Sequence, residues 1–178
     1  MQEIEVKSYT RYSGKIVNIG NFAYNINTLP SNLTLVANSI DERTEEKIIN
    51  LIDSNNSSEL KNIMNCISKE ISPELGCKLN DYHWNSLNPG EGMQPEQEDY
   101  RYYNPCVVVF NLGSDIEMIF NDVKTRRQYP VMLPRRSMFL LKGQNYQRII
   151  SKKFIDKVGN DTYQRERRYS MVFKSLKI

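Results

Sequence analysis

Residues 105–121 read Pro-Cys-Val-Val-Val-Phe-Asn-Leu-Gly-Ser-Asp-Ile-Glu-Met-Ile-Phe-Asn, and this stretch decides the fold class. Its two apolar runs, 105–112 and 115–121, flank Gly113-Ser114, a pattern that predicts two strands joined by a turn. Short apolar runs of the same kind recur on both sides of it. They predict further strands over 33–36, 79–87, 130–133, 137–142, 146–151 and 168–174. The chain after Gly76 is therefore predicted to consist of strands.

Two helices are predicted before these strands. Ser39 and Glu42 have the spacing of a capping box, which places the start of a helix there. Its inward-facing residues are expected to be Ile48, Ile49, Leu51 and Ile52. A second helix is expected to begin with Ser57 or Ser58 as its cap and to end before Gly76. Helices followed by many short strands predict an α+β protein, with two N-terminal helices packed on one sheet of a jelly roll.

The chain of 178 residues has the length of one domain, and we predict a single domain over 1–178. Residues 1–29 are expected to form an N-terminal arm or hairpin, because they are rich in Tyr, Asn and Gly. Residues 30–76 are expected to hold a strand and the two helices, and residues 77–178 the jelly-roll core.

Composition excludes a membrane protein and favours a cytoplasmic one. The mean hydropathy is −0.59, and there is no 18-residue apolar run that could cross a membrane. The first residues lack the basic and apolar regions of a secretory signal. Cys66, Cys77 and Cys106 are odd in number and lack metal-ligand spacing, so they are predicted to be reduced thiols.

The net charge of +3 conceals an uneven distribution. From Lys124 to the end there are 15 Lys or Arg and 3 Asp or Glu, a net +12, so the rest has 9 against 18, a net −9. One interpretation is a basic face that binds nucleic acid. The other is that the two parts fold together and their charges intermix.

Few residues could carry catalysis. His83 is the sole histidine, which excludes a metal site with two histidines, and a lone histidine in a strand is usually structural. The acidic residues Glu91, Glu96, Glu98 and Asp99 could together hold a hard cation, or they could form a solvated loop.

Five stretches between Pro30 and Lys174 give the sequence a resemblance to AlkB-type dioxygenases of eukaryotic type, which use Fe(II) and 2-oxoglutarate. They are PSNLTLV (30–36), LNDYHWNSLNPGEGM (79–93), YYNPCVVVFNLGS (102–114), LPRRSMFLLKG (133–143) and RYSMVFK (168–174). No single stretch is specific, but their order and spacing together are. The resemblance implies a double-stranded β-helix, which is a jelly roll.

The resemblance also implies an iron site and a cosubstrate site, and this chain departs from both. The family's His-x-Asp and distal His fall on Glu96, Glu98 and Ser151, which include no imidazole. The four cosubstrate positions fall on Asn85, Leu87, Arg168 and Lys174. Asn85 and Arg168 match the family, whereas Leu87 replaces Tyr and Lys174 replaces Arg. We therefore expect a catalytically inactive protein with no cofactor.

An inactive chain of this kind is expected to keep a surface for RNA or a ribonucleoprotein, the ribosome included. The predicted RNA-binding residues are Arg126, Arg127, Arg135, Arg136, Lys142, Arg148, Lys152, Lys153, Lys157, Arg165 and Arg167. Aromatic residues that could stack on bases are Tyr129, Tyr146, Phe154 and Tyr163. Two other hypotheses stay open: a protein–protein adaptor that uses the acidic half or the N-terminal arm, and a surviving dioxygenase with an unusual metal site.

Overall fold

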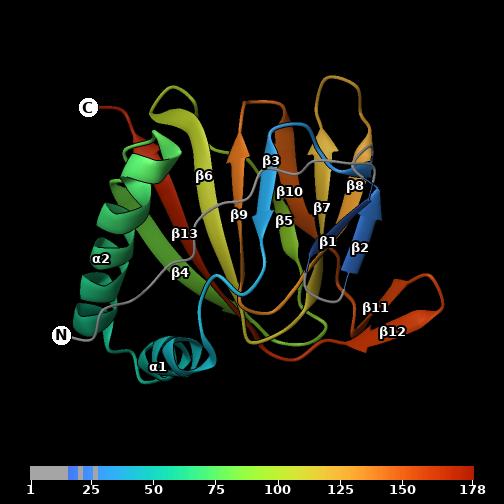
Figure 1. Cartoon of the computed structure of the whole chain (residues 1–178), viewed down its shortest axis with the longest axis horizontal. Coiled ribbons are helices and arrows are strands. Elements are labelled where there is room, and N and C mark those ends of the chain that lie inside the picture. The colour runs from blue at the N-terminus through green and yellow to red at the C-terminus, as the bar shows by residue number, and fades with distance from the viewer. Residues whose placement is uncertain (1–15, 20–21, 26–27) are drawn as a thin grey trace.

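The computed structural model describes residues 16–19, 22–25 and 28–178, which form two antiparallel sheets, two helices and two hairpins (Figure 1). The five-stranded sheet has the order β3 (Leu33–Val36), β9 (Ser137–Lys142), β6 (Tyr103–Leu112), β13 (Arg168–Leu176) and β4 (Asp81–Leu87). The four-stranded sheet has the order β5 (Met93–Glu96), β10 (Tyr146–Ile150), β7 (Ile116–Asp122) and β8 (Gln128–Leu133). The hairpins are β1 (Ile16–Ile19) with β2 (Phe22–Asn25), and β11 (Ile155–Val158) with β12 (Asp161–Gln164). The helices are α1 (Glu42–Asp53) and α2 (Ser57–Leu75).

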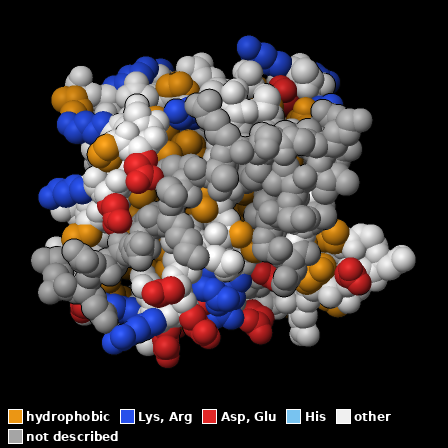
Figure 2. All heavy atoms as spheres, in the orientation of Figure 1, with side chains coloured by type: hydrophobic (Ala, Val, Ile, Leu, Met, Phe, Trp, Pro, Cys, Tyr) orange, Lys and Arg blue, Asp and Glu red, His pale blue; other side chains and the backbone are white. Residues whose placement is uncertain are grey.

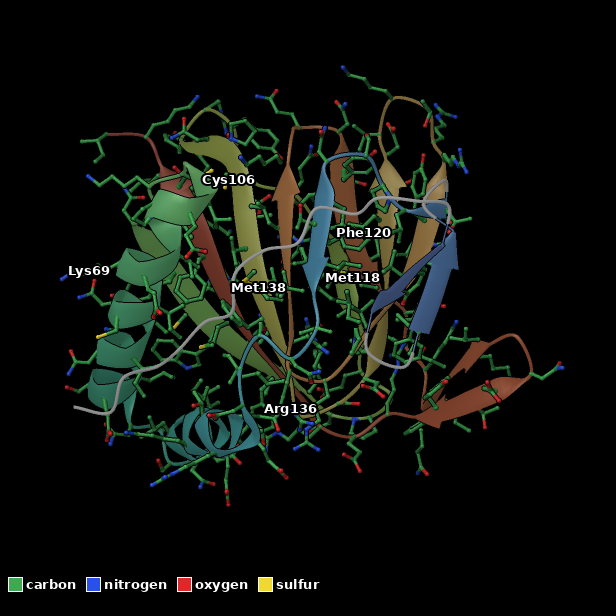
Figure 3. The ribbon with its side chains drawn as sticks, viewed as in Figure 1. Lys69, Cys106, Met118, Phe120, Arg136 and Met138 are labelled. Atoms are coloured by element: carbon green, nitrogen blue, oxygen red, sulfur yellow. The ribbon has the colours of Figure 1, made fainter. Side chains whose placement is uncertain are left out.

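The five-stranded sheet is covered on both faces, which explains the continuous apolar run in β6. Val108 and Phe110 pack with the helices, whereas Val107 and Val109 face the four-stranded sheet. A strand buried on both faces has no need to alternate apolar with polar residues. In Figure 3, Cys106 and Met138 belong to the core under the helices, and Met118 and Phe120 to the core between the sheets. The prediction of two helices packed on one sheet of a jelly-roll-like sandwich is confirmed.

The expected strands are found with small shifts at their ends, but the helix starts differ from prediction. The Asp41 carboxylate caps α1 by accepting the N–H of Thr44 at 2.7 Å, and Asn56 caps α2. Ser39 is buried, and its hydroxyl donates to the Arg136 carbonyl 97 residues away. The capping-box prediction is therefore wrong, because Ser39 is used in a long-range contact.

Some elements were not predicted, and part of the N-terminal prediction lies outside the described residues. The β1–β2 hairpin falls within the expected arm over 1–29, of which residues 1–15 are not described. The short strand β5 and the hairpin β11–β12 are new relative to the sequence prediction. In the described part of the chain, no helix has the length and apolar character needed to cross a membrane.

A buried carboxylate joins α1 to the two turns beneath the jelly roll. Glu45 accepts the N–H of Gly113 at 3.0 Å and two bonds from the Arg135 Nε at 2.8 and 2.9 Å. Arg136, labelled beside α1 in Figure 3, donates to the same carboxylate at 3.4 Å. Gly113 has φ +82°, and a Cβ there would lie 2.5 Å from the Arg167 carbonyl oxygen, so this turn requires glycine.

Candidate functional site

Polar side chains gather between the two sheets, next to the edge strands β4 and β5. On β4, Tyr82 and Trp84 pack with the helices, so alternation directs Asn85 and Leu87 toward the space between the sheets. Leu87 accordingly packs on the core between the sheets. The same alternation brings residues from β5, β10 and β13 into this space.

An ion pair between Arg148 and Glu98 dominates this interior site. The exposed fractions of these residues are 2% and 7%. The Arg148 Nη1 donates to Glu98 Oε2 at 3.0 Å, and the Nη2 to Oε1 at 2.7 Å. The Glu96 carboxylate lies 3.8 Å from the same Nη2, and the Lys174 ammonium lies 3.9 Å from Glu98. Two cations and two anions therefore balance each other in the interior.

The environment of Glu98 keeps it ionised. Burial alone would raise its pKa, but hydrogen bonds and charge from Arg148, with help from Lys174, outweigh burial and hold the pKa of Glu98 below its usual value. His83, also on β4, has its pKa lowered by loss of solvent and by the nearby Lys174. The site thus favours a charged carboxylate and a neutral imidazole.

The structure brings together two of the three predicted metal positions, Glu96 and Glu98. Ser151 is not with them, because the pairing of β10 with β5 places Arg148 opposite Glu96 and Ile150 opposite Met93. Ser151 follows Ile150 and lies beyond Met93, where its carbonyl accepts a bond from Arg165 at 2.6 Å. The assignment of Ser151 as the distal position is therefore wrong, and Arg148 is the residue across the sheet from Glu96.

This set of side chains does not fit a divalent metal. The two carboxylates direct their oxygens at a guanidinium, and Lys174 adds a second cation beside Glu98. A metal ion bound to Glu96 and Glu98 would be repelled by both cations. In the described residues, no group of three His, Cys, Asp or Glu side chains could hold a metal.

The predicted cosubstrate positions are only partly available to a ligand. The Asn85 Oδ1 accepts the Ser170 hydroxyl, and Lys174 lies over the Tyr103 ring with its ammonium 5.2 Å from the centroid. Arg168 is 2% exposed, and its Nε donates to Asn111 Oδ1 at 2.7 Å. Burial lowers the pKa of Arg168 to about 10, and its Nη2 is buried without a hydrogen-bond partner in the described structure.

A row of polar residues crosses the five-stranded sheet beside Arg168 and was missed in the sequence. Asn85 pairs with Ser170, Ser170 with Asn111, and Asn111 with Ser137. Among the described residues, the Ser137 hydroxyl and the Arg168 Nη2 are the two buried side-chain polar atoms without a partner. The signal was present in the sequence, since each of these polar residues interrupts an otherwise apolar strand.

Most of the eleven predicted RNA-binding cations have partners within the fold. Arg148 and Arg165 are buried on Glu98 and Asp156, so their assignment as RNA contacts is wrong. Arg135 and Arg136 bind Glu45. The other engaged cations are Arg167 at 3.5 Å from Asp53, Lys153 at 3.5 Å from Glu117, and Lys142 at 3.1 Å from the Leu75 carbonyl. Arg126, Arg127, Lys152 and Lys157 remain exposed.

Comparison with known proteins supports the fold and nothing finer. No family model and no curated protein matches the sequence. The structure resembles that of a prolyl-4-hydroxylase from Pseudomonas putida, with a TM-score of 0.54 and 9% identity over 83% of this chain and 89% of that one. A second match is OsALKBH1, with a TM-score of 0.41 and 14% identity over 92% and 86% of the two chains. The chain therefore has the fold of the dioxygenases that use 2-oxoglutarate and Fe(II).

Proposed function

We propose that this chain is a catalytically silent AlkB-like protein with double-stranded β-helix connectivity, and that it binds RNA or a ribonucleoprotein, the ribosome included, in the cytoplasm. The observation that carries the loss of catalysis is the Arg148 guanidinium held by Glu98 and near Glu96. A fixed cation there takes up the carboxylates that a metal would need.

The RNA part of the proposal rests on the cations that the fold leaves at its surface. Of the eleven predicted contacts, seven have internal partners and four are exposed: Arg126, Arg127, Lys152 and Lys157. An RNA surface would therefore be smaller than the net +12 of the last 55 residues suggests. Phosphate contacts by a few exposed cations still give binding that depends strongly on salt.

We expect the purified chain to bind a single-stranded RNA at 50 mM salt, with an affinity that falls as salt is raised. Each phosphate contact contributes about 0.7 to the slope of log affinity against log salt. The slope is measured by fluorescence anisotropy between 50 and 300 mM salt. Absence of binding at 50 mM salt, or a slope near zero, would contradict the RNA proposal and favour a protein adaptor.

A second candidate function is recognition of a small carboxylate between the sheets. It is favoured by Arg168, whose Nη2 is unpartnered, and by the nearby Ser137 hydroxyl, which is unpartnered too. A buried guanidinium without a carboxylate is costly, and a bound carboxylate would relieve that cost. This function needs no metal and no turnover, so it is compatible with a silent site.

Acetate, succinate and 2-oxoglutarate, each tested without metal, should raise the melting temperature of the chain if this second function holds. The increase should vanish in Arg168→Met, which removes an unpaired buried cation and is expected to fold. Arg167→Met is the matched control, since Arg167 is the exposed neighbour of Arg168. Equal responses of the two variants would show that the carboxylates bind elsewhere.

A further inference from the structure

Three cations lie at the turn between β7 and β8, at the end of the molecule away from α1 (Figure 1). They are Lys124, Arg126 and Arg127, all exposed, and residues 122–127 carry three positive charges against one negative, a net +2. Figure 2 shows Lys and Arg side chains gathered at this corner. The ion pairs found among the described residues do not involve Lys124 or Arg126, so their charge is presented to solvent.

The backbone of this turn is held in one conformation. The Asp122 Oδ1 accepts the N–H groups of Lys124 and Thr125 at 2.9 and 3.1 Å. The N–H of Arg126 bonds to the Asp122 carbonyl at 2.7 Å, and the N–H of Asp122 to the Arg127 carbonyl at 2.9 Å. Those amides lower the pKa of Asp122, whose charge is thereby directed at the backbone. The three cationic side chains therefore project from a fixed base.

Arg127 has a second feature that a plain charge cluster lacks. Its guanidinium lies 4.7 Å from the centroid of the Tyr129 ring. Tyr129 is half-buried and packs edge-on against Tyr146, with centroids 6.1 Å apart, so its ring is fixed. An arginine plane supported on an aromatic ring is a surface on which an unstacked base can lie.

A neighbouring turn extends this surface. The N–H of Val123 donates to the Asn145 carbonyl at 2.7 Å, which fixes the β9–β10 turn beside the cations. Val123 itself is 41% exposed. The corner thus combines phosphate-binding charge, a stacking plane and a small apolar contact. By contrast, Lys152 and Lys157 stand apart beside the β11–β12 hairpin, and Lys153 is paired with Glu117.

We propose that the turn between β7 and β8, residues 122–129, is a contact site for single-stranded RNA, in which Lys124 and Arg126 bind phosphates and the Arg127–Tyr129 stack receives a base. This inference rests on the proposed RNA function and names the surface that performs it. Unpaired strands are favoured because bases in a duplex are already stacked on each other.

The test compares two triple variants of the full chain. Lys124→Ala, Arg126→Asn and Arg127→Ala remove the three turn cations, with Asn at position 126 because the backbone there has φ 60°. The matched control, Lys61→Ala, Lys69→Ala and Lys78→Ala, removes the same charge from exposed residues on and after α2. Lys69 is seen pointing away from the sheets in Figure 3. Circular dichroism establishes that both variants are folded.

Binding is measured by anisotropy with a fluorescein-labelled 12-nucleotide oligouridine, a duplex RNA of the same length and polyglutamate. The turn variant should bind oligouridine about tenfold or more weakly, with the salt slope reduced by about 2, and the control should stay close to wild type. Arg127→Lys keeps the charge but not the stack, so its affinity should fall about fivefold or more at an unchanged slope.

Each other outcome overturns the inference in a recognisable way. Equal losses in the turn variant and the control would mean that binding follows net charge and has no site at this turn. Tighter binding to the duplex or to polyglutamate would assign the surface to a different partner. Wild-type binding that survives the turn variant would leave the proposed RNA function intact and reject this surface, whereas absence of wild-type binding would reject both.

Discussion

Replacing Glu98 with alanine should lower the free energy of unfolding by about 3–5 kcal/mol, because it leaves the Arg148 guanidinium buried without its main partner. Urea unfolding gives this value from the midpoint and the slope. Asp99→Ala is the matched control: the adjacent carboxylate pairs with Arg101 at the surface, and its removal should leave the midpoint unchanged. Equal midpoints for the two variants would mean that the Arg148–Glu98 pair does not hold the sheets together.

A second variant separates the loss of a partner from the loss of the pair. Glu98→Leu combined with Arg148→Met replaces both charges by apolar groups, and buried ion pairs exchanged in this way often cost little. We therefore expect the double variant to recover most of the stability lost in Glu98→Ala. A double variant as unstable as the single one would show that the pair contributes shape or specificity that apolar residues cannot supply.

Acid should act on the same pair. The pKa of Glu98 is lower in the folded chain than its usual value near 4.5, so its stabilisation is complete above pH 4.5 and is lost as the pH falls through the lower folded value. The wild type should therefore lose stability below pH 4.5 more steeply than the double variant. Parallel curves would indicate that Glu98 does not carry the acid sensitivity.

The second large effect concerns metal affinity. Glu96→His, Glu98→Asp and Arg148→His together remove the interior cation and provide two imidazoles and one carboxylate, the set typical of non-haem Fe(II) sites. We expect Mn(II) to bind this variant about 100-fold or more tightly than wild type, measured by isothermal titration calorimetry. Turnover of 2-oxoglutarate should stay at background, since Leu87 and Lys174 are unchanged.

The control for this variant keeps Arg148 and places the third histidine at Ser151 instead. In the structure Arg148 faces Glu96, whereas Ser151 lies beyond Met93, so the control should gain no affinity. A control that binds Mn(II) as well as the Arg148→His variant would show that the pairing of β5 with β10 has been misassigned.

Local patterns in the sequence predicted the fold well, but not the pairing across it. The run Val107 to Phe110 is predictable because a strand buried on both faces must be apolar throughout. Ser39 was misread as a cap because its partner, the Arg136 carbonyl, is distant in sequence. The start of α1 at Asp41 was consequently missed by two residues.

The candidate site shows the same limit more strongly. Glu96 and Glu98 were found by counting along the chain, whereas Ser151 was placed wrongly because a register shift lies between Arg148 and Ile150. The charges of the basic C-terminal region could not be judged from composition, since Arg135 and Arg148 pair with carboxylates 90 and 50 residues away. Intermixing of the two parts' charges, the second of the two interpretations, accounts for most of the asymmetry.

The central claim is that a guanidinium held by carboxylates stands in the interior where a dioxygenase would bind its metal. The most direct test is titration of the unaltered chain with Fe(II) under anaerobic conditions, followed by addition of oxygen and 2-oxoglutarate with assay of succinate. We predict no stoichiometric binding of Fe(II) and no succinate above background. One equivalent of tightly bound Fe(II) together with steady formation of succinate would contradict the account.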